Sequence, residues 1–123
     1  MVCHTVVIVS GHPETRSSLE ALVTRAGFDA RTADSLEAWL PDAKTARGHC
    51  LVLDTVRGDL AGPERLALLA VVCSSRPVLV LTDAGDVPTA VQAIRQGAVD
   101  VMQKPVDHLV VLERIRRLLP MLA

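Results

Sequence analysis

Three short apolar runs constrain the fold of this chain more than any other feature of its sequence. They read VVIV at 6–9, CLVL at 50–53 and VLVL at 78–81. None of them alternates apolar with polar residues, so a strand formed by any of them would be apolar on both faces. Strands of this kind suit a parallel sheet that is covered by helices on both sides. The runs therefore predict the centre of an α/β domain.

Amphipathic helical patterns lie between and after these runs. Apolar residues recur at the i, i+3, i+4, i+7 spacing of a helix within 19–26, 66–73, 87–94 and 111–119. A shorter helix is expected at 36–40, with Asp34 as its N-cap and Glu37 at the third helical position. Weaker strands are expected at 29–33, which is polar and suits an edge, and at 99–103. Five β-α units joined by right-handed crossovers give an open, doubly wound sheet.

Size and composition exclude several classes of function. The 123 residues fit one domain, which we expect to span 1–123. The two aromatic residues, Phe28 and Trp39, are too few for a base-stacking platform or an aromatic cage. A net charge of −1 gives no field that favours nucleic acid or an anionic membrane. Three cysteines without a CxxC pair, and the lack of a long apolar run or a signal-peptide pattern, favour a cytoplasmic protein.

Polar residues follow the predicted strands at their carboxyl ends, which is where doubly wound sheets bind ligands. Taken alone, an aspartate there is most often a turn residue, a threonine a capping hydroxyl and a lysine a solvated side chain. Delivered by separate strands to one edge, they instead predict a binding site. In chain order these residues are Ser10, Gly11, His12, Asp54, Thr82, Asp83 and Lys104.

The motifs around these positions resemble the receiver domain of two-component response regulators. They are CLVLD at 50–54 with Gly62 eight residues on, LVLTDAGDVPTAVQAIRQGAVD at 79–100 and QKP at 103–105. The chain is most similar to the subgroup with a LuxR-type DNA-binding domain downstream, the nitrogen-fixation regulator type. This resemblance implies a flavodoxin-like fold with a five-stranded parallel sheet of order 2-1-3-4-5 and five helices.

The resemblance also implies roles for individual residues. Asp54 matches the phosphoacceptor, which takes a phosphoryl group from a kinase histidine. Thr82 matches the hydroxyl that follows the phosphoryl group, and Lys104 matches the lysine that pairs with Asp54. The Lys104–Pro105 bond is expected to be cis, as in the family. Such a domain is not an enzyme beyond self-phosphorylation of Asp54 from a phosphodonor.

The chain departs from the family at the end of its first strand. It reads IVSGHPETRSSL where the family reads IVDDxxxxRxxL, so Ser10 and Gly11 replace the acidic pair that holds Mg²⁺. Mg²⁺ binds mainly through carboxylates, so we expect neither a metal nor another cofactor here. Without the metal, Lys104 should pair directly with Asp54. Three acids in the adjoining loops could substitute for the missing pair: Glu14, Asp59 and Asp83.

Two further positions depart from the family pattern. Val101 stands where the family has an aromatic switch residue, and valine is too short and too stiff at χ1 for that rotation. Gly58 replaces the proline that is usual in the loop after Asp54. We interpret the chain as a pseudo-receiver with impaired Mg²⁺-dependent phosphorylation, which acts by protein–protein interaction.

The expected partners are a histidine kinase, an effector domain or a second copy of the chain. A second copy would bind through the face made by the fourth helix, the fifth strand and the fifth helix. Neither nucleic acid nor a membrane is expected as a direct partner, because cations in a last helical turn simply suit the helix dipole. The last helix carries Arg114, Arg116 and Arg117. The residues expected on the docking face are Val91, Ala98, Val101 and Val111.

Other functions stay open at this point. The first is a working phosphoacceptor with unusual metal chemistry, which the retained Asp54, Thr82 and Lys104 favour. The second is a domain that binds a small anionic ligand where SGHPET begins the first helix, since helix N-termini accept anions. A zinc site is a weaker hypothesis, because cysteine and histidine pairs precede two neighbouring strands. Its residues would be Cys3, His4, His49 and Cys50.

Overall fold

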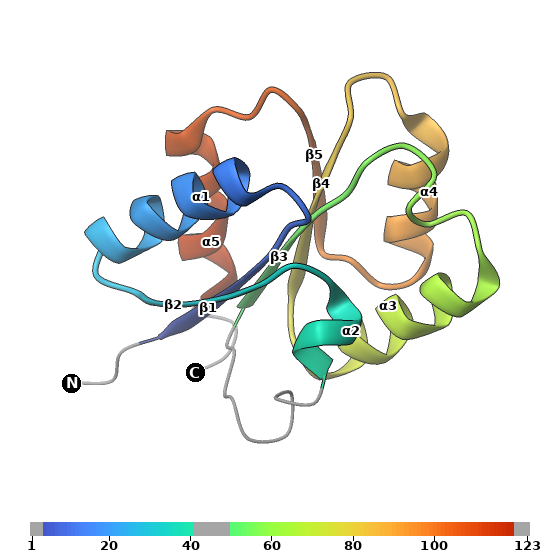
Figure 1. Cartoon of the computed structure of the whole chain (residues 1–123), viewed down its shortest axis with the longest axis horizontal. Coiled ribbons are helices and arrows are strands. Elements are labelled where there is room, and N and C mark those ends of the chain that lie inside the picture. Colours follow the sequence, from blue (N-terminus) through green and yellow to red (C-terminus); the bar gives the residue numbers. More distant parts are fainter. Residues whose placement is uncertain (1–3, 41–49, 120–123) are drawn as a thin grey trace.

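The computed structural model describes residues 4–40 and 50–119, in which five strands alternate with five helices (Figure 1). The strands are β1 (Thr5–Val9), β2 (Asp29–Ala33), β3 (Cys50–Asp54), β4 (Val78–Thr82) and β5 (Asp100–Gln103). The helices are α1 (Pro13–Arg25), α2 (Leu36–Trp39), α3 (Pro63–Ser75), α4 (Val87–Arg95) and α5 (His108–Leu118). The three apolar runs thus form β1, β3 and β4.

The strands form one parallel sheet in the order β2-β1-β3-β4-β5, which confirms the expected doubly wound fold. The polar strand β2 lies at one edge, as its composition indicated. In the pairing register Val9 lies beside Leu53, and Asp54 lies beside Leu81. The residues that follow β1, β3 and β4 therefore meet at one edge of the sheet.

Helices cover both faces of the sheet, and alternate strand residues pack against each layer. In Figure 1, α1 and α5 lie on one side of the sheet, and α2, α3 and α4 lie on the other. Val6 and Ile8 of β1 belong to the core cluster of α1 and α5. Val7 and Val9 belong to the cluster of α2, α3 and α4. This arrangement explains why the central runs are apolar at every position.

Prolines and a glycine mark several helix boundaries. Pro13, Pro63 and Pro88 lie at the first or second position of α1, α3 and α4, where a missing N–H costs little. Gly97 follows α4 with a φ of 108°, a conformation that favours glycine.

The N-cap predicted for α2 was wrong by one residue. Ser35 rather than Asp34 is the N-cap, and its side chain accepts a hydrogen bond from the Ala38 N–H. The two residues are adjacent and both types cap helices well, so the sequence alone does not separate them.

The apolar stripe of α4 faces solvent instead of the sheet. Val87, Val91 and Ile94 are 58%, 41% and 52% exposed. The helix packs on the sheet through the small residues Thr89 and Ala93, which are 5% and 0% exposed. Periodicity alone cannot tell which of two faces packs inward when the buried face is made of small residues.

Two residues assigned to the docking face are instead part of the core. Ala98 is 7% exposed and Val111 is fully buried, so neither can contact a partner. Val91 is exposed and Val101 is partly buried. The exposed apolar residues of this region are Val87, Val91, Ile94, Val99 and Leu109, which we call the α4–α5 patch. No helix in the part of the chain that the structure describes is long and apolar enough to cross a membrane.

Candidate functional site

The sheet brings Asp54, Thr82, Lys104 and Ser10 to the same edge. Asp54 and Thr82 are the last residues of β3 and β4. Ser10 follows β1, and Lys104 follows β5 with its backbone N–H donating to the Thr82 carbonyl. The Lys104–Pro105 peptide bond is cis, as expected. The convergence predicted from the sequence is therefore present in the structure.

The Asp54 carboxylate is buried and has a hydrogen-bond partner on each oxygen. Lys104 Nζ donates to Oδ1 at 2.8 Å, and Ser10 Oγ donates to Oδ2 at 2.8 Å. The Asp54 side chain is only 1% exposed. The direct ion pair expected between Lys104 and Asp54 is confirmed. The charge of the buried carboxylate is thus balanced by a single ammonium group.

Lys104 is held by two further oxygens. Its Nζ donates to the Thr55 carbonyl at 2.6 Å and lies 3.1 Å from Asp83 Oδ1. Burial by itself lowers the pKa of Lys104, but the hydrogen bonds to Asp54 and Asp83 outweigh it and raise the pKa above its ordinary value. The ammonium group is therefore a fixed cation of this edge.

The three acids that could replace the missing pair lie in different surroundings. Asp83 accepts the Arg57 N–H at 2.9 Å and pairs with Lys104. The Arg57 N–H, and next to it Lys104, lower the pKa of Asp83. Asp59 Oδ2 accepts the Val56 N–H at 2.9 Å, and Glu14 lies in the first turn of α1. Within residues 4–40 and 50–119, no three His, Cys, Asp or Glu side chains form a group that could hold a metal ion.

Ser10 has a structural role that its sequence context did not predict. Besides its bond to Asp54, its hydroxyl accepts the His12 N–H at 3.1 Å, and its carbonyl accepts from Arg16 Nη1 at 2.7 Å. These contacts fix the start of α1 against the sheet. A hydroxyl residue directly after β1, at the same edge as Asp54, was the available signal. The sequence places Ser10 at this edge in place of an acid, but it does not predict the hydrogen bond to Asp54.

The Thr82 hydroxyl is buried and makes no hydrogen bond within the described part of the chain. Thr82 is fully buried, and its Oγ1 has no hydrogen-bond partner among the residues that the structure describes. A buried hydroxyl without a partner is costly and uncommon. It stands at the end of β4, beside the strand that ends in Asp54.

The remaining candidate residues lie away from Asp54. Val101 is in β5 and packs against the core cluster of α2, α3 and α4. Arg114 pairs with Asp100, and Arg117 pairs with Glu113 one helical turn away. Cys3 and His49 of the zinc hypothesis lie outside the described residues. Burial raises the pKa of the Cys50 thiol to about 12.

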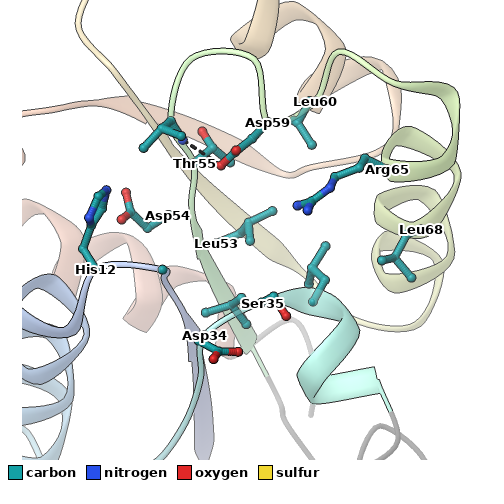
Figure 2. Close-up of a pocket in the computed structure, with 14 residues that line it drawn as sticks. His12, Asp34, Ser35, Leu53, Asp54, Thr55, Asp59, Leu60, Arg65 and Leu68 are labelled. Atoms are coloured by element: carbon teal, nitrogen blue, oxygen red, sulfur yellow. Dashed lines mark hydrogen bonds between the residues drawn. The ribbon is translucent and has the colours of Figure 1, made fainter.

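A cavity of about 280 Å³ opens beside Asp54 (Figure 2). It lies between the end of β1, the start of α2, the β3–α3 loop and the first turns of α3. His12 and Asp54 line one side of it, and Arg65 reaches in from α3 on the other side (Figure 2). The candidate site therefore consists of a closed ion-pair network and an open cavity next to it.

Comparisons with known proteins match the chain to one family. Residues 6–116 match the family described as "Response regulator receiver domain". The transcriptional regulatory protein FixJ of Rhizobium meliloti is 38% identical over 95% of this chain and 57% of its own length. The nitrogen assimilation regulatory protein NtrX of Azorhizobium caulinodans is 30% identical over 90% of this chain and 25% of its own length. The chain thus spans about half the length of the FixJ relative and a quarter of NtrX.

Solved structures share the fold. The crystal structure titled FIXJ-N has a TM-score of 0.82 and 38% identity, and the match covers 98% of this chain and 96% of that one. A response regulator from Thermotoga maritima has a TM-score of 0.81 at 20% identity, with 97% of this chain and 99% of that one covered, which shows likeness of fold alone.

Proposed function

The chain belongs to the response regulator receiver domain family, and we propose that it is a degenerate member that signals without Mg²⁺-dependent phosphorylation of Asp54. In this proposal the domain is a binding module rather than an enzyme, and any phosphorylation is a side reaction of Asp54. The family membership also favours a cytoplasmic location, where kinases and effector domains meet their receivers.

The observation that carries this proposal is the environment of the Asp54 carboxylate. Ser10 and Lys104 each donate to one of its oxygens at 2.8 Å. Mg²⁺ keeps an octahedral shell of oxygen ligands and is usually bound through carboxylates. Asp54 contributes one carboxylate at this edge, and Lys104 already balances its charge.

The replacement of the acidic pair by Ser10 and Gly11 bears directly on phosphoryl transfer. The reaction depends on positioning and on neutralising the charge of the equatorial phosphoryl oxygens. A carboxylate that attacks a phosphoryl group meets charge repulsion, which a divalent cation would otherwise offset. Here Lys104 is the cation beside Asp54, and Asp83 shares it at 3.1 Å. We therefore expect phosphorylation to be slow at best.

The test is incubation of the chain with acetyl phosphate and Mg²⁺, followed by intact-mass measurement. We expect no stoichiometric adduct of about 80 Da on the wild-type chain. The double variant Ser10→Asp/Gly11→Asp restores both carboxylates and should acquire the adduct. It should also gain thermal stability from Mg²⁺, because the metal relieves repulsion among the three carboxylates. Position 11 has room, since a Cβ there would lie 3.9 Å from the Asp34 carbonyl oxygen.

Asp54→Asn in the double-variant background is the control for the site of modification. It should abolish the adduct while leaving the fold intact, because asparagine is nearly isosteric with aspartate. A stoichiometric, hydroxylamine-labile adduct on Asp54 of the wild-type chain would contradict the proposal.

A second candidate function is a working phosphoacceptor with unusual metal chemistry. The unpartnered Thr82 hydroxyl favours it, because a phosphoryl group on Asp54 would offer an acceptor to a buried donor that lacks one among the described residues. The same mass measurement distinguishes the two candidates. Repeating it with Thr82→Val asks whether the hydroxyl contributes to any adduct that forms.

The α4–α5 patch is the proposed output surface. Its side chains include Leu109, which is 74% exposed, and Val87 and Ile94, each more than half exposed. Clusters of exposed apolar side chains mark protein interaction surfaces. We propose that a second copy of the chain binds here without phosphorylation, and that a histidine kinase or an effector domain is the alternative partner. The FixJ relative, of whose length this chain matches 57%, is a transcriptional regulatory protein, which supports an effector domain as that alternative partner.

A further inference from the structure

The cavity beside Asp54 has an apolar interior. Leu36, Leu53 and Leu60 line it and are each 5–6% exposed. They come from α2, β3 and the β3–α3 loop and belong to one core cluster, so three separate elements supply the apolar lining, which we call the leucine wall. An apolar cavity that also has a few charged groups at its rim has the usual composition of a small-molecule site.

The cavity is open next to Asp54 because position 11 has no side chain. Gly11 lines the cavity, and the nearest heavy atom to a Cβ built there is the Asp34 carbonyl oxygen at 3.9 Å. A side chain at this position would therefore extend into open space. The same substitution that removes an acid from the family pattern leaves room for a ligand.

Opposite charges face this cavity from different elements. Arg65 extends its guanidinium from α3 toward Leu53 (Figure 2). Its ion pair with Glu37 is 3.6 Å long, and both side chains are about half exposed. Such an exposed pair is worth little, so the guanidinium remains available to a ligand.

Carboxylates stand on other sides of the cavity. Asp34 precedes α2, and Asp59 lies in the β3–α3 loop with one oxygen bonded to the Val56 N–H. Asp54 adds little charge of its own, because Lys104 neutralises it. The cavity thus presents one cation, two carboxylates and an apolar wall.

We propose that this cavity binds a small zwitterion, an α-amino acid with a branched apolar side chain. The ligand carboxylate pairs with Arg65, whose planar fork of donors suits a bidentate contact. The ligand ammonium group lies near Asp34, beside the start of α2, and the side chain packs on the leucine wall. At about 280 Å³ the cavity lies slightly below the usual range of small-molecule pockets, which favours a ligand of the size of an amino acid over a nucleotide or a flavin.

Ligand binding in this cavity would extend the proposed function, and it does not depend on whether Asp54 is phosphorylated. A ligand bound beside Asp54 would supply the input that a phosphoryl group supplies to other receivers. Binding is measured without phosphodonor or Mg²⁺. Failure to bind leucine would therefore contradict the ligand proposal alone, whereas a stoichiometric adduct from acetyl phosphate would contradict the phosphorylation proposal alone.

Isothermal titration calorimetry with a matched series of ligands tests the proposal. L-Leucine should bind saturably with a dissociation constant below about 1 mM. 4-Methylpentanoate lacks the ammonium group, and 3-methylbutylamine lacks the carboxylate. Each should bind at least about tenfold more weakly, because one charge of the cavity is left without its partner. L-Glutamine keeps the zwitterion but has a polar side chain, and should also bind more weakly.

Two pairs of variants assign the binding to this cavity. Arg65→Gln should weaken leucine binding about tenfold and leave 3-methylbutylamine unaffected. Its matched control is Arg95→Gln, in the last turn of α4 and outside the cavity. Asp34→Asn should weaken leucine and leave 4-methylpentanoate unaffected, with Asp29→Asn at the other end of β2 as its control. Circular dichroism verifies that every variant is folded.

Any one of three results would overturn the proposal. The first is the absence of saturable leucine binding up to about 10 mM, and the second is equal affinity for leucine and 4-methylpentanoate. The third is leucine binding that both Arg65→Gln and Asp34→Asn leave unchanged.

Discussion

Lys104 makes a pH-dependent contribution to stability at the scale of single residues. Its pKa is raised above the ordinary value of 10.5 once the hydrogen bonds to Asp54 and Asp83 outweigh burial. The folded chain therefore holds this proton more tightly than the unfolded chain. The resulting stability is fully present below the unfolded pKa and is lost as the pH rises through the folded pKa.

We expect Lys104→Met to lower the free energy of unfolding by about 2 kcal/mol near neutral pH, because it leaves the buried Asp54 without its cation. The difference from the wild-type chain should shrink above pH 10.5, the ordinary lysine pKa. Urea unfolding between neutral pH and that range measures it, with Arg95→Gln as a control for loss of a cation elsewhere. A difference that stays constant with pH would show that Lys104 acts by packing alone.

Residue types predicted which residues form the site better than they predicted the hydrogen bonds between them. Asp54 and Thr82 could be found because each ends a strand whose apolar run is easy to recognise, and Lys104 because it follows the weaker strand expected at 99–103 and belongs to the QKP motif. The contact between Ser10 and Asp54 could not be found in the same way, because it depends on a side-chain rotamer at the end of β1. The cavity beside Asp54 also escaped notice, since it arises from the space between four elements.

At the scale of elements, α4 shows where hydrophobic periodicity misleads. Its apolar residues have helical spacing, and the helix forms where they predict it. The exposed stripe nevertheless faces solvent, because Thr89 and Ala93 let the helix approach the sheet closely. Element type and approximate bounds were thus predictable. Which face of α4 packs inward depends on the whole layer.

The exposed stripe of α4 should mediate self-association. We expect the wild-type chain to form dimers as its concentration rises, and Val91→Lys to weaken the dimer at least about tenfold by placing a charge in an apolar contact. Light scattering after size-exclusion chromatography measures both. Val71→Lys is the matched control, because Val71 is 61% exposed on α3 and lies outside the patch.

A chain that stays monomeric at all concentrations would remove the second copy as the partner. The α4–α5 patch would then be assigned to a kinase or an effector domain. A dimer that responds to Val71→Lys and not to Val91→Lys would place the interface on α3.

At the scale of the whole molecule, one sheet separates two core clusters. Ile115 is fully buried in the α1–α5 cluster, and Leu69 is fully buried in the opposite cluster. Trp39, the single tryptophan of the chain, belongs to the opposite cluster and is 3% exposed. Its fluorescence therefore reports one layer, while far-ultraviolet circular dichroism reports the helices of both.

Because every central strand contributes side chains to both clusters, we expect the two layers to unfold together. Ile115→Ala and Leu69→Ala should each cost about 2–5 kcal/mol, the usual range for such a truncation in a core. For both variants, urea curves from tryptophan fluorescence and circular dichroism should coincide. A shift for Ile115→Ala in the circular dichroism curve alone would show that the α1–α5 layer can open while Trp39 stays buried. In that case a ligand beside Asp54 would stabilise the α2–α4 layer alone, and the site could not influence α5 through the sheet.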